Sequence, residues 1–121
     1  MQISDDNILS KFTKNIKGSY NIINKMSGNA IRLYNIIISD YMLYNNKEFA
    51  LMNKQLKEIS VKMGNVSISY IKNLITEMRK YRVIYTLNTR GYYKVNPFLA
   101  WKGDIKYKLE EERIFYQKFN K

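Results

Sequence analysis

Apolar residues recur at the three- and four-residue spacing of a helix face in three central segments of the chain. This spacing predicts helices over residues 30–44, 54–63 and 67–81. The apolar stripes are Ile31, Tyr34, Ile37, Ile38 and Tyr41 in the first segment, Leu56, Ile59 and Met63 in the second, and Ile71, Leu74, Ile75 and Met78 in the third. The first segment is the most apolar, and we expect it to form the central buried helix.

The pattern changes from helical to extended after residue 82. Residues 83–87 are β-branched and aromatic, residues 88–91 form a turn in which Gly91 supplies a positive φ, and residues 92–95 return as a strand. We expect a further small strand within residues 47–52. Asn96 and Pro97 then predict a short helical turn over residues 98–101.

The two ends of the chain predict flanking helices. Residues 6–26 have an interrupted helical pattern, and Asp104 can begin a last helix with Ile105, Leu109, Tyr116 and Phe119 on one side. That side serves either as cover for the core or as a dimer interface. With no repeat and no linker, we expect one domain over residues 1–121, with a core at 28–103, an N-terminal helical extension at 1–27 and a C-terminal helix at 104–121.

The order of the central elements predicts the fold class. Two helices joined by a short turn at Gly64, followed at once by a hairpin, are typical of a winged helix-turn-helix. The expected fold is therefore mainly α with a small β-hairpin: a winged helix-turn-helix with flanking N- and C-terminal helices. The same pattern also occurs in small domains that bind proteins.

The charge of the chain favours a polyanionic partner. The chain has 21 basic and 10 acidic residues and a net charge of +11. Residues 47–103 hold eleven of the basic residues and three of the acidic ones, a net charge of +8. Codons rich in A and T would also favour Lys, but they would spread it evenly along the chain. The concentration over the helix-turn-helix therefore favours a binding face for double-stranded DNA.

Helix 67–81 supplies the candidate DNA-binding residues. Its exposed side and first turn carry hydrogen-bonding and cationic side chains, which can read base edges in the major groove or hold phosphates. The residues expected nearest the bases are Ser69, Tyr70, Lys72, Asn73 and Thr76, and the N–H groups near Ser67 at the start of the helix can bind a phosphate. The expected phosphate contacts are Lys54, Lys57, Arg79 (or its neighbour Lys80), Arg90 and Lys94. The alternative interpretation is that this basic face is merely solvated and that Ser67 only caps the helix.

The composition argues against several other classes of function. The chain contains neither Cys nor His, which excludes Cys/His zinc sites, Ser-His-Asp and Cys-His nucleophile systems and an imidazole base. No phosphate-binding loop motif occurs, and the adjacent carboxylates cannot converge on one metal. We expect no enzyme activity and no cofactor. No apolar stretch approaches the ~18 residues of a membrane span, and the polar N-terminus does not resemble a signal peptide, so we expect a cytoplasmic protein without a membrane partner.

Several segments resemble the RepL-type replication proteins of small plasmids. They are IRLYNIIISDYM, the helix pair within MNKQLKEISVKMGNVSISYIKNLITEMRKYRVI, and YYKVNPFLAWKGD, which together cover roughly residues 30–105. In that family the winged-helix region ends with a strand, an Asn-Pro pair, a short apolar turn and a Gly-Asp step, which resemble residues 93–95, Asn96-Pro97, residues 98–101 and Gly103-Asp104 here. The resemblance implies a winged-helix replication initiator of a plasmid or phage, which recognises an origin and has no catalytic role of its own.

Three functions remain open on the sequence. The first is sequence-specific origin recognition, and the second is transcriptional repression by the same winged helix. The third is a protein–protein adaptor that recruits host replication proteins through the 105–119 stripe. A homodimer would fit either DNA-binding function, because such domains often read two half-sites one helical turn apart.

Overall fold

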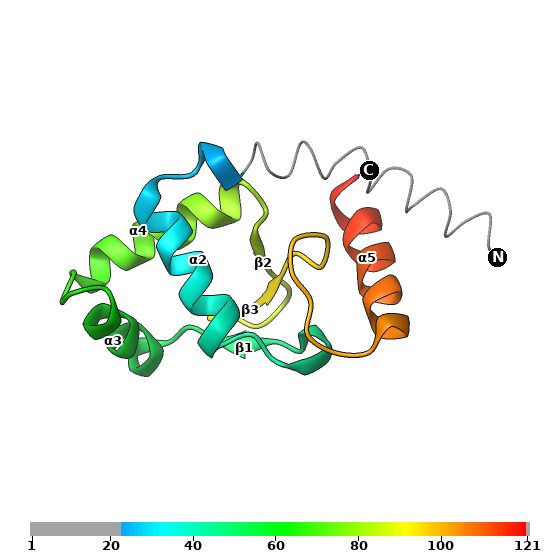
Figure 1. Cartoon of the computed structure of the whole chain (residues 1–121), viewed down its shortest axis with the longest axis horizontal. Helices are drawn as coiled ribbons and strands as arrows, with labels where there is room; N and C mark the ends of the chain where they lie inside the picture. Colours follow the sequence, from blue (N-terminus) through cyan, green and yellow to red (C-terminus); the bar gives the residue numbers. More distant parts are fainter. Residues whose placement is uncertain (1–22, 121) are drawn as a thin grey trace.

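The most apolar segment of the chain forms α2 (Gly28–Asp40) in the computed structural model, which describes residues 23–120 (Figure 1). The Ser27 hydroxyl begins the helix by accepting from the Ala30 N–H. The helix ends four residues before the predicted limit at Tyr44. Residues Tyr44–Asn46 form instead the 3-10 turn η1, because Asn45 and Asn46 have φ values of 56° and 57°, which an α-helix does not allow.

The predicted helix pair is confirmed as α3 (Asn53–Lys62) and α4 (Ile68–Lys80). Residues 63–67 connect them, and Gly64 and Asn65 both have a positive φ there. Both α2 and α3 pack against α4. Apolar stripes from all three helices meet in one core, which includes Leu33, Ile37, Ile59, Ile71 and Met78.

The predicted hairpin is confirmed as β2 (Ile84–Thr86) and β3 (Tyr92–Val95). The strand expected within residues 47–52 is β1 (Phe49–Ala50). It pairs with β3, so that the antiparallel sheet has the order β1-β3-β2. Residues 87–91 connect β2 to β3 and are called the β2–β3 loop below. In this loop Gly91 has the predicted positive φ, 84°.

The last helix, α5 (Ile105–Phe119), lies beyond the sheet at the side opposite α3 (Figure 1). Its predicted apolar stripe is wrong at the start, because Ile105 is 68% exposed. The buried residues of α5 are Glu112 and Phe115. Phe115 and Phe119 pack edge-on against Tyr85 of β2, with ring centroids 5.2 and 5.6 Å away. The helix therefore covers the sheet with its C-terminal half.

A hydrogen-bonded turn follows β3 where a short helical turn was expected. Asn96 accepts from the Leu99 N–H through its carbonyl and from the Phe98 N–H through its side chain. The fold is thus mainly helical with one small antiparallel sheet. Among the described helices, none is both long and apolar enough to cross a membrane. The helical extension expected over 1–27 lies, apart from residues 23–27, outside the described residues.

Candidate nucleic-acid interface

Helix α4 has an outer face composed of polar and cationic side chains. At 3.6 residues per turn, the buried Ile71, Leu74, Ile75 and Met78 occupy one side of the helix. The opposite side carries six exposed residues: Ser69, Lys72, Asn73, Thr76, Arg79 and Lys80. Five of these were predicted as site residues, and Lys80 was the predicted alternative to Arg79. This face could be predicted from the sequence because the apolar stripe of α4 is regular.

Two hydroxyl groups of α4 are engaged within the helix itself. Ser67 is the N-cap, and its Oγ accepts from the Tyr70 N–H at 3.0 Å. The Thr76 hydroxyl donates to the Lys72 carbonyl at 3.1 Å. The Thr76 oxygen keeps its lone pairs on the outer face, where they can accept a hydrogen bond. Ser67 has the capping role that the sequence allowed as an alternative to a DNA contact.

Tyr70 and Glu77 lie on the side of α4 that faces the start of α2. The Tyr70 hydroxyl accepts from the Asn29 amide at 2.7 Å. The Glu77 carboxylate accepts from the Ser27 N–H at 2.6 Å and from the Ser27 hydroxyl at 2.9 Å. The only acid of α4 is therefore held away from the outer face. Tyr70 is held with it and so is separated from the other predicted base-contacting residues.

A groove separates α4 from the β2–β3 loop. Its volume is about 510 Å³. Lys72, Thr76 and Arg79 of α4 line one side, and Arg90 of the loop lines the other. The structure therefore brings together four predicted site residues that are up to 18 positions apart in the sequence. Seven further residues line the groove that were not predicted as DNA contacts, among them Met52 and Asn53 at the start of α3 and Tyr93 of β3.

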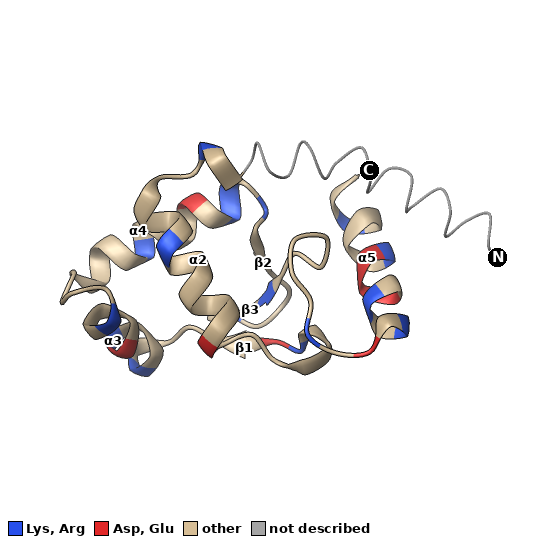
Figure 2. Cartoon of the chain, in the orientation of Figure 1, with Lys and Arg blue, Asp and Glu red and all other residues tan. Residues whose placement is uncertain are grey.

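The predicted cations around this groove are free of acidic partners. Within the described part of the chain, Lys54, Lys57, Lys72, Arg79 and Arg90 are all exposed and form no ion pair. Lys54 and Lys57 lie on α3 outside the lining of the groove. Acidic residues gather instead on α5 (Figure 2), where Lys108 pairs with Glu112 and Arg113 with Glu110.

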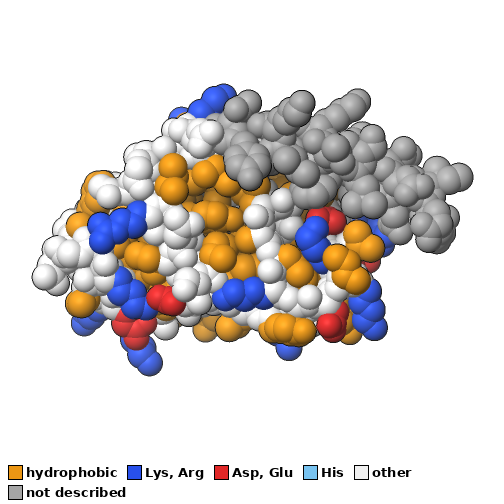
Figure 3. Space-filling model, in the orientation of Figure 1, with side chains coloured by type: hydrophobic (Ala, Val, Ile, Leu, Met, Phe, Trp, Pro, Cys, Tyr) orange, Lys and Arg blue, Asp and Glu red, His pale blue; other side chains and the backbone are white. Residues whose placement is uncertain are grey.

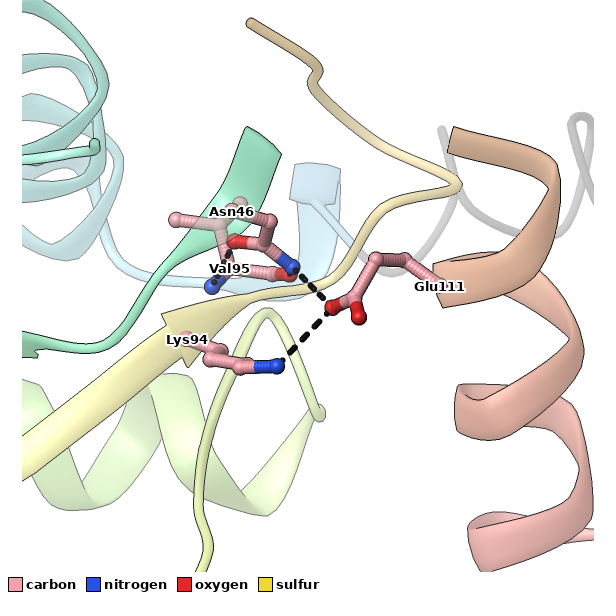
Figure 4. Close-up of polar contacts among 4 residues, drawn as sticks. All are labelled: Asn46, Lys94, Val95 and Glu111. Atoms are coloured by element: carbon pink, nitrogen blue, oxygen red, sulfur yellow. Dashed lines mark hydrogen bonds and ion pairs between the residues drawn. The ribbon is translucent and has the colours of Figure 1, made fainter. Parts of the chain in front are cut away.

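Lys94 lies away from the groove, in contrast to the other predicted phosphate contacts. Side chains alternate across a strand, so that Tyr93 lines the groove while Lys94 points to the opposite face of the sheet. There its ammonium pairs with Glu111 Oε1 at 3.1 Å, and the Asn46 amide donates to the same oxygen at 3.3 Å (Figure 4). The Lys94 side chain is only 18% exposed. It joins α5 to the sheet.

The described residues contain no group of three or more acidic side chains that could hold a metal ion. The polar side chains that line the groove are an amide, hydroxyl groups and cations, a set that suits hydrogen bonding and phosphate binding. Comparison of the chain with models of protein families, with curated proteins and with solved structures gives no match.

Proposed function

We propose that this chain is a winged helix-turn-helix protein that binds double-stranded DNA. The order of its elements supports this: α2, β1, the pair α3 and α4, and then the β2–β3 hairpin. In this interpretation α4 is the recognition helix and the β2–β3 loop is the wing. A helix of about 10–12 Å diameter fits the major groove, which is about 12 Å wide.

The observation that carries the proposal is the shared groove of α4 and the loop. Lys72, Arg79 and Arg90 meet there from two elements, and the described residues provide no carboxylate that neutralises them. Unpaired cations that gather at one groove attract the phosphates of a DNA backbone. The acid that could oppose them, Glu77, is bound to Ser27 on another side of α4.

The exposed residues divide into two groups by their chemistry. Ser69, Asn73 and Thr76 project from the outer face of α4 and can hydrogen-bond to base edges; the Asn73 amide suits the N6 and N7 edge of adenine. Lys72 can reach either a guanine or a phosphate. Arg79 and Arg90, with Lys54 and Lys57 of α3, would hold the backbone.

The biological role that we propose is initiation of plasmid or phage replication, with the DNA being an origin. It is supported by the resemblance of residues 30–105 to RepL-type proteins. A repressor would use the same surface, so a genetic test separates the two. A plasmid whose origin lies beside this gene should replicate only when the gene is intact, whereas a repressor gene should be dispensable for replication and should silence a promoter.

The biochemical test measures binding to duplex DNA as the salt concentration rises. Duplexes of about 30 base pairs, selected from a random pool by the protein itself, serve as probes. We expect log Kd to rise with log salt at a slope of about 0.9 for each phosphate contact, so that Lys54, Lys57, Lys72, Arg79 and Arg90 alone account for a slope of about 4 to 5. A response without salt dependence would contradict DNA binding through this surface.

Two variants distinguish base contacts from backbone contacts in the same assay. Asn73→Ala should reduce the preference for selected over random duplexes by about 5- to 100-fold, with the salt slope unchanged. Arg90→Gln should weaken binding to both duplexes equally and lower the slope by about 0.9. Asn35→Ala, at an exposed position of α2, is the control and should do neither.

A further inference from the structure

A second groove lies next to the first one and includes the end of α5. Its volume is about 610 Å³. Thr76 and Arg79 line both grooves, so the two meet at α4. The first groove reaches Arg90 and Gly91 of the β2–β3 loop, and the second reaches Leu87 at the other end of the loop and Thr86 at the end of β2. The loop therefore stands between two adjoining grooves.

The second groove is strongly cationic. Its charged lining residues are Arg79, Lys80, Arg82 and Lys118, and no acidic residue lines it. Within the described residues Lys80 and Lys118 form no ion pair. Their ammonium groups lie 5.5 Å from the ring centre of Tyr81 and 5.6 Å from that of Phe119. Both charges are thus available to an anion from outside the protein.

Arg82 explains why the end of α5 belongs to this groove. Its backbone is left-handed, with φ at 57°, which is costly for a residue with a Cβ atom. In that conformation its guanidinium donates to the Phe119 carbonyl at 3.0 Å and lies 4.7 Å from the centre of the Phe119 ring. The carbonyl is one of those that the end of a helix leaves without a partner. Arg82 therefore fixes Lys118 beside α4.

We propose that the second groove binds backbone phosphates of the same DNA duplex that α4 reads, so that α5 is part of the DNA-binding surface. This inference rests on the proposed function. The continuity of the two grooves at Thr76 and Arg79 supports it, because a duplex held by the first groove would continue past the second. Phosphates repeat along each strand, so that neighbouring cationic grooves can hold one backbone.

The test compares two double variants with the same loss of charge. Lys80→Gln with Lys118→Gln removes the free ammonium groups of the second groove. Lys47→Gln with Lys106→Gln is the matched control, since both lysines are exposed and lie outside the two grooves. Lys106 also matches Lys118 in its setting: it lies on α5, with its ammonium 5.1 Å from the ring centre of Tyr107.

We expect the first double variant to lower the salt slope of duplex binding by about 1.8, or about 0.9 for each lysine. Its preference among duplex sequences should not change, because phosphates carry no sequence information. The control variant, Lys47→Gln with Lys106→Gln, should have the same salt slope as the wild type. Thermal unfolding of each variant, which should match the wild type, shows that the fold is intact.

The outcomes separate this inference from the proposed function. A wild-type protein that binds no duplex overturns both. A wild-type protein that binds with a steep salt slope, while the two double variants change that slope equally or not at all, overturns only the role of the second groove. A changed sequence preference in Lys80→Gln with Lys118→Gln would also contradict it, because it would place these side chains at base edges.

Discussion

At the scale of single residues, Tyr34 combines burial with an unsatisfied polar atom. It lies in the core with 7% of its surface exposed, and its hydroxyl has no hydrogen-bond partner among the described residues. Burial disfavours the charged phenolate and raises the pKa of Tyr34 to about 12. The ring of Tyr34 therefore contributes apolar contacts to the core. Its hydroxyl reduces the stability of the fold and makes that stability decrease at alkaline pH.

We expect Tyr34→Phe to raise the free energy of unfolding by about 1 kcal/mol at neutral pH, because the unsatisfied hydroxyl is removed. The pKa of Tyr34 is higher in the folded protein than in the unfolded chain, where it is near 10. The free energy of unfolding is therefore unaffected by this group below about pH 10, and it decreases as the pH rises from about 10 to about 12, because the unfolded chain ionises first. Urea unfolding over this pH range should therefore show a smaller decrease of the free energy of unfolding in the variant than in the wild type.

The exposed Tyr107 provides the control for this measurement. Tyr107→Phe should leave both the stability and its dependence on pH unchanged, since 44% of that residue is exposed. Some alkaline loss should remain in every variant, because burial and the nearby Glu111 also raise the pKa of Tyr85. A Tyr34→Phe protein that is less stable at neutral pH would show that the hydroxyl has a favourable interaction.

At the scale of elements, Asn46 joins three parts of the fold. Its side chain is fully buried. The amide donates to the Val95 carbonyl at 2.9 Å, and the side-chain oxygen accepts from the Val95 N–H at 3.1 Å (Figure 4). Asn46 thus continues the pairing of β3 where β1 is absent, and its bond to Glu111 connects the same point to α5.

We expect Asn46→Ala to lower the free energy of unfolding by about 3 kcal/mol, because it leaves both polar groups of Val95 buried without partners. Asn46→Gly should lower it by about 1 kcal/mol less, since glycine adopts the φ of 57° without strain. Urea unfolding measures both changes. Asn35→Ala, at an exposed position, is the control and should lower the free energy of unfolding by no more than about 0.5 kcal/mol. If Asn46→Ala lowers it no more than this control does, Asn46 does not hold the three parts of the fold together.

The elements differ in how far the sequence predicts them. Local periodicity was sufficient for α3, α4 and the hairpin, because their apolar stripes and the turn at Gly91 are encoded within each segment. It failed at the end of α2, which stops at Asp40 although apolar residues continue: the Tyr41 and Met42 N–H groups both donate to the Ile37 carbonyl, and Leu43 is already extended. The pairing of β1 with β3 joins residues more than 40 positions apart, and no local pattern specifies it.

The same distinction applies to the candidate site. The outer face of α4 follows from its stripe, so Lys72, Asn73 and Arg79 were predictable. The positions of Tyr70 and Lys94 were not, because each depends on a partner from a distant element: Asn29 for Tyr70 and Glu111 for Lys94. The start of the predicted α5 stripe was wrong for a related reason. That helix buries Glu112, whose carboxylate is compensated by Lys108, instead of the apolar Ile105.

At the scale of the whole molecule, the large positive charge opposes folding, and in the proposed function it favours binding to DNA. The net charge is +11. On the face shown in Figure 3, hydrophobic side chains gather in the middle and most Lys and Arg side chains lie around them. Like charges on one compact surface repel each other, and salt screens this repulsion over a Debye length of about 10 Å at 0.1 M. Salt should therefore act on the free protein and on a DNA complex in opposite directions.

We expect the melting temperature of the free protein to rise by a few degrees between about 50 and about 300 mM salt, because screening weakens the repulsion. At the lower salt concentration, duplex DNA at about 100 times its Kd should stabilise the fold by about 2.7 kcal/mol. This gain should decrease as salt weakens phosphate binding, so that the melting curves with and without DNA converge. Thermal unfolding over a salt series, with an uncharged polymer such as dextran as the control additive, measures both effects. If the melting temperatures with and without DNA stay equally far apart at all salt concentrations, the DNA is held by contacts other than those to its phosphates. If salt lowers the melting temperature of the free protein, ion pairs outweigh the repulsion between the cations.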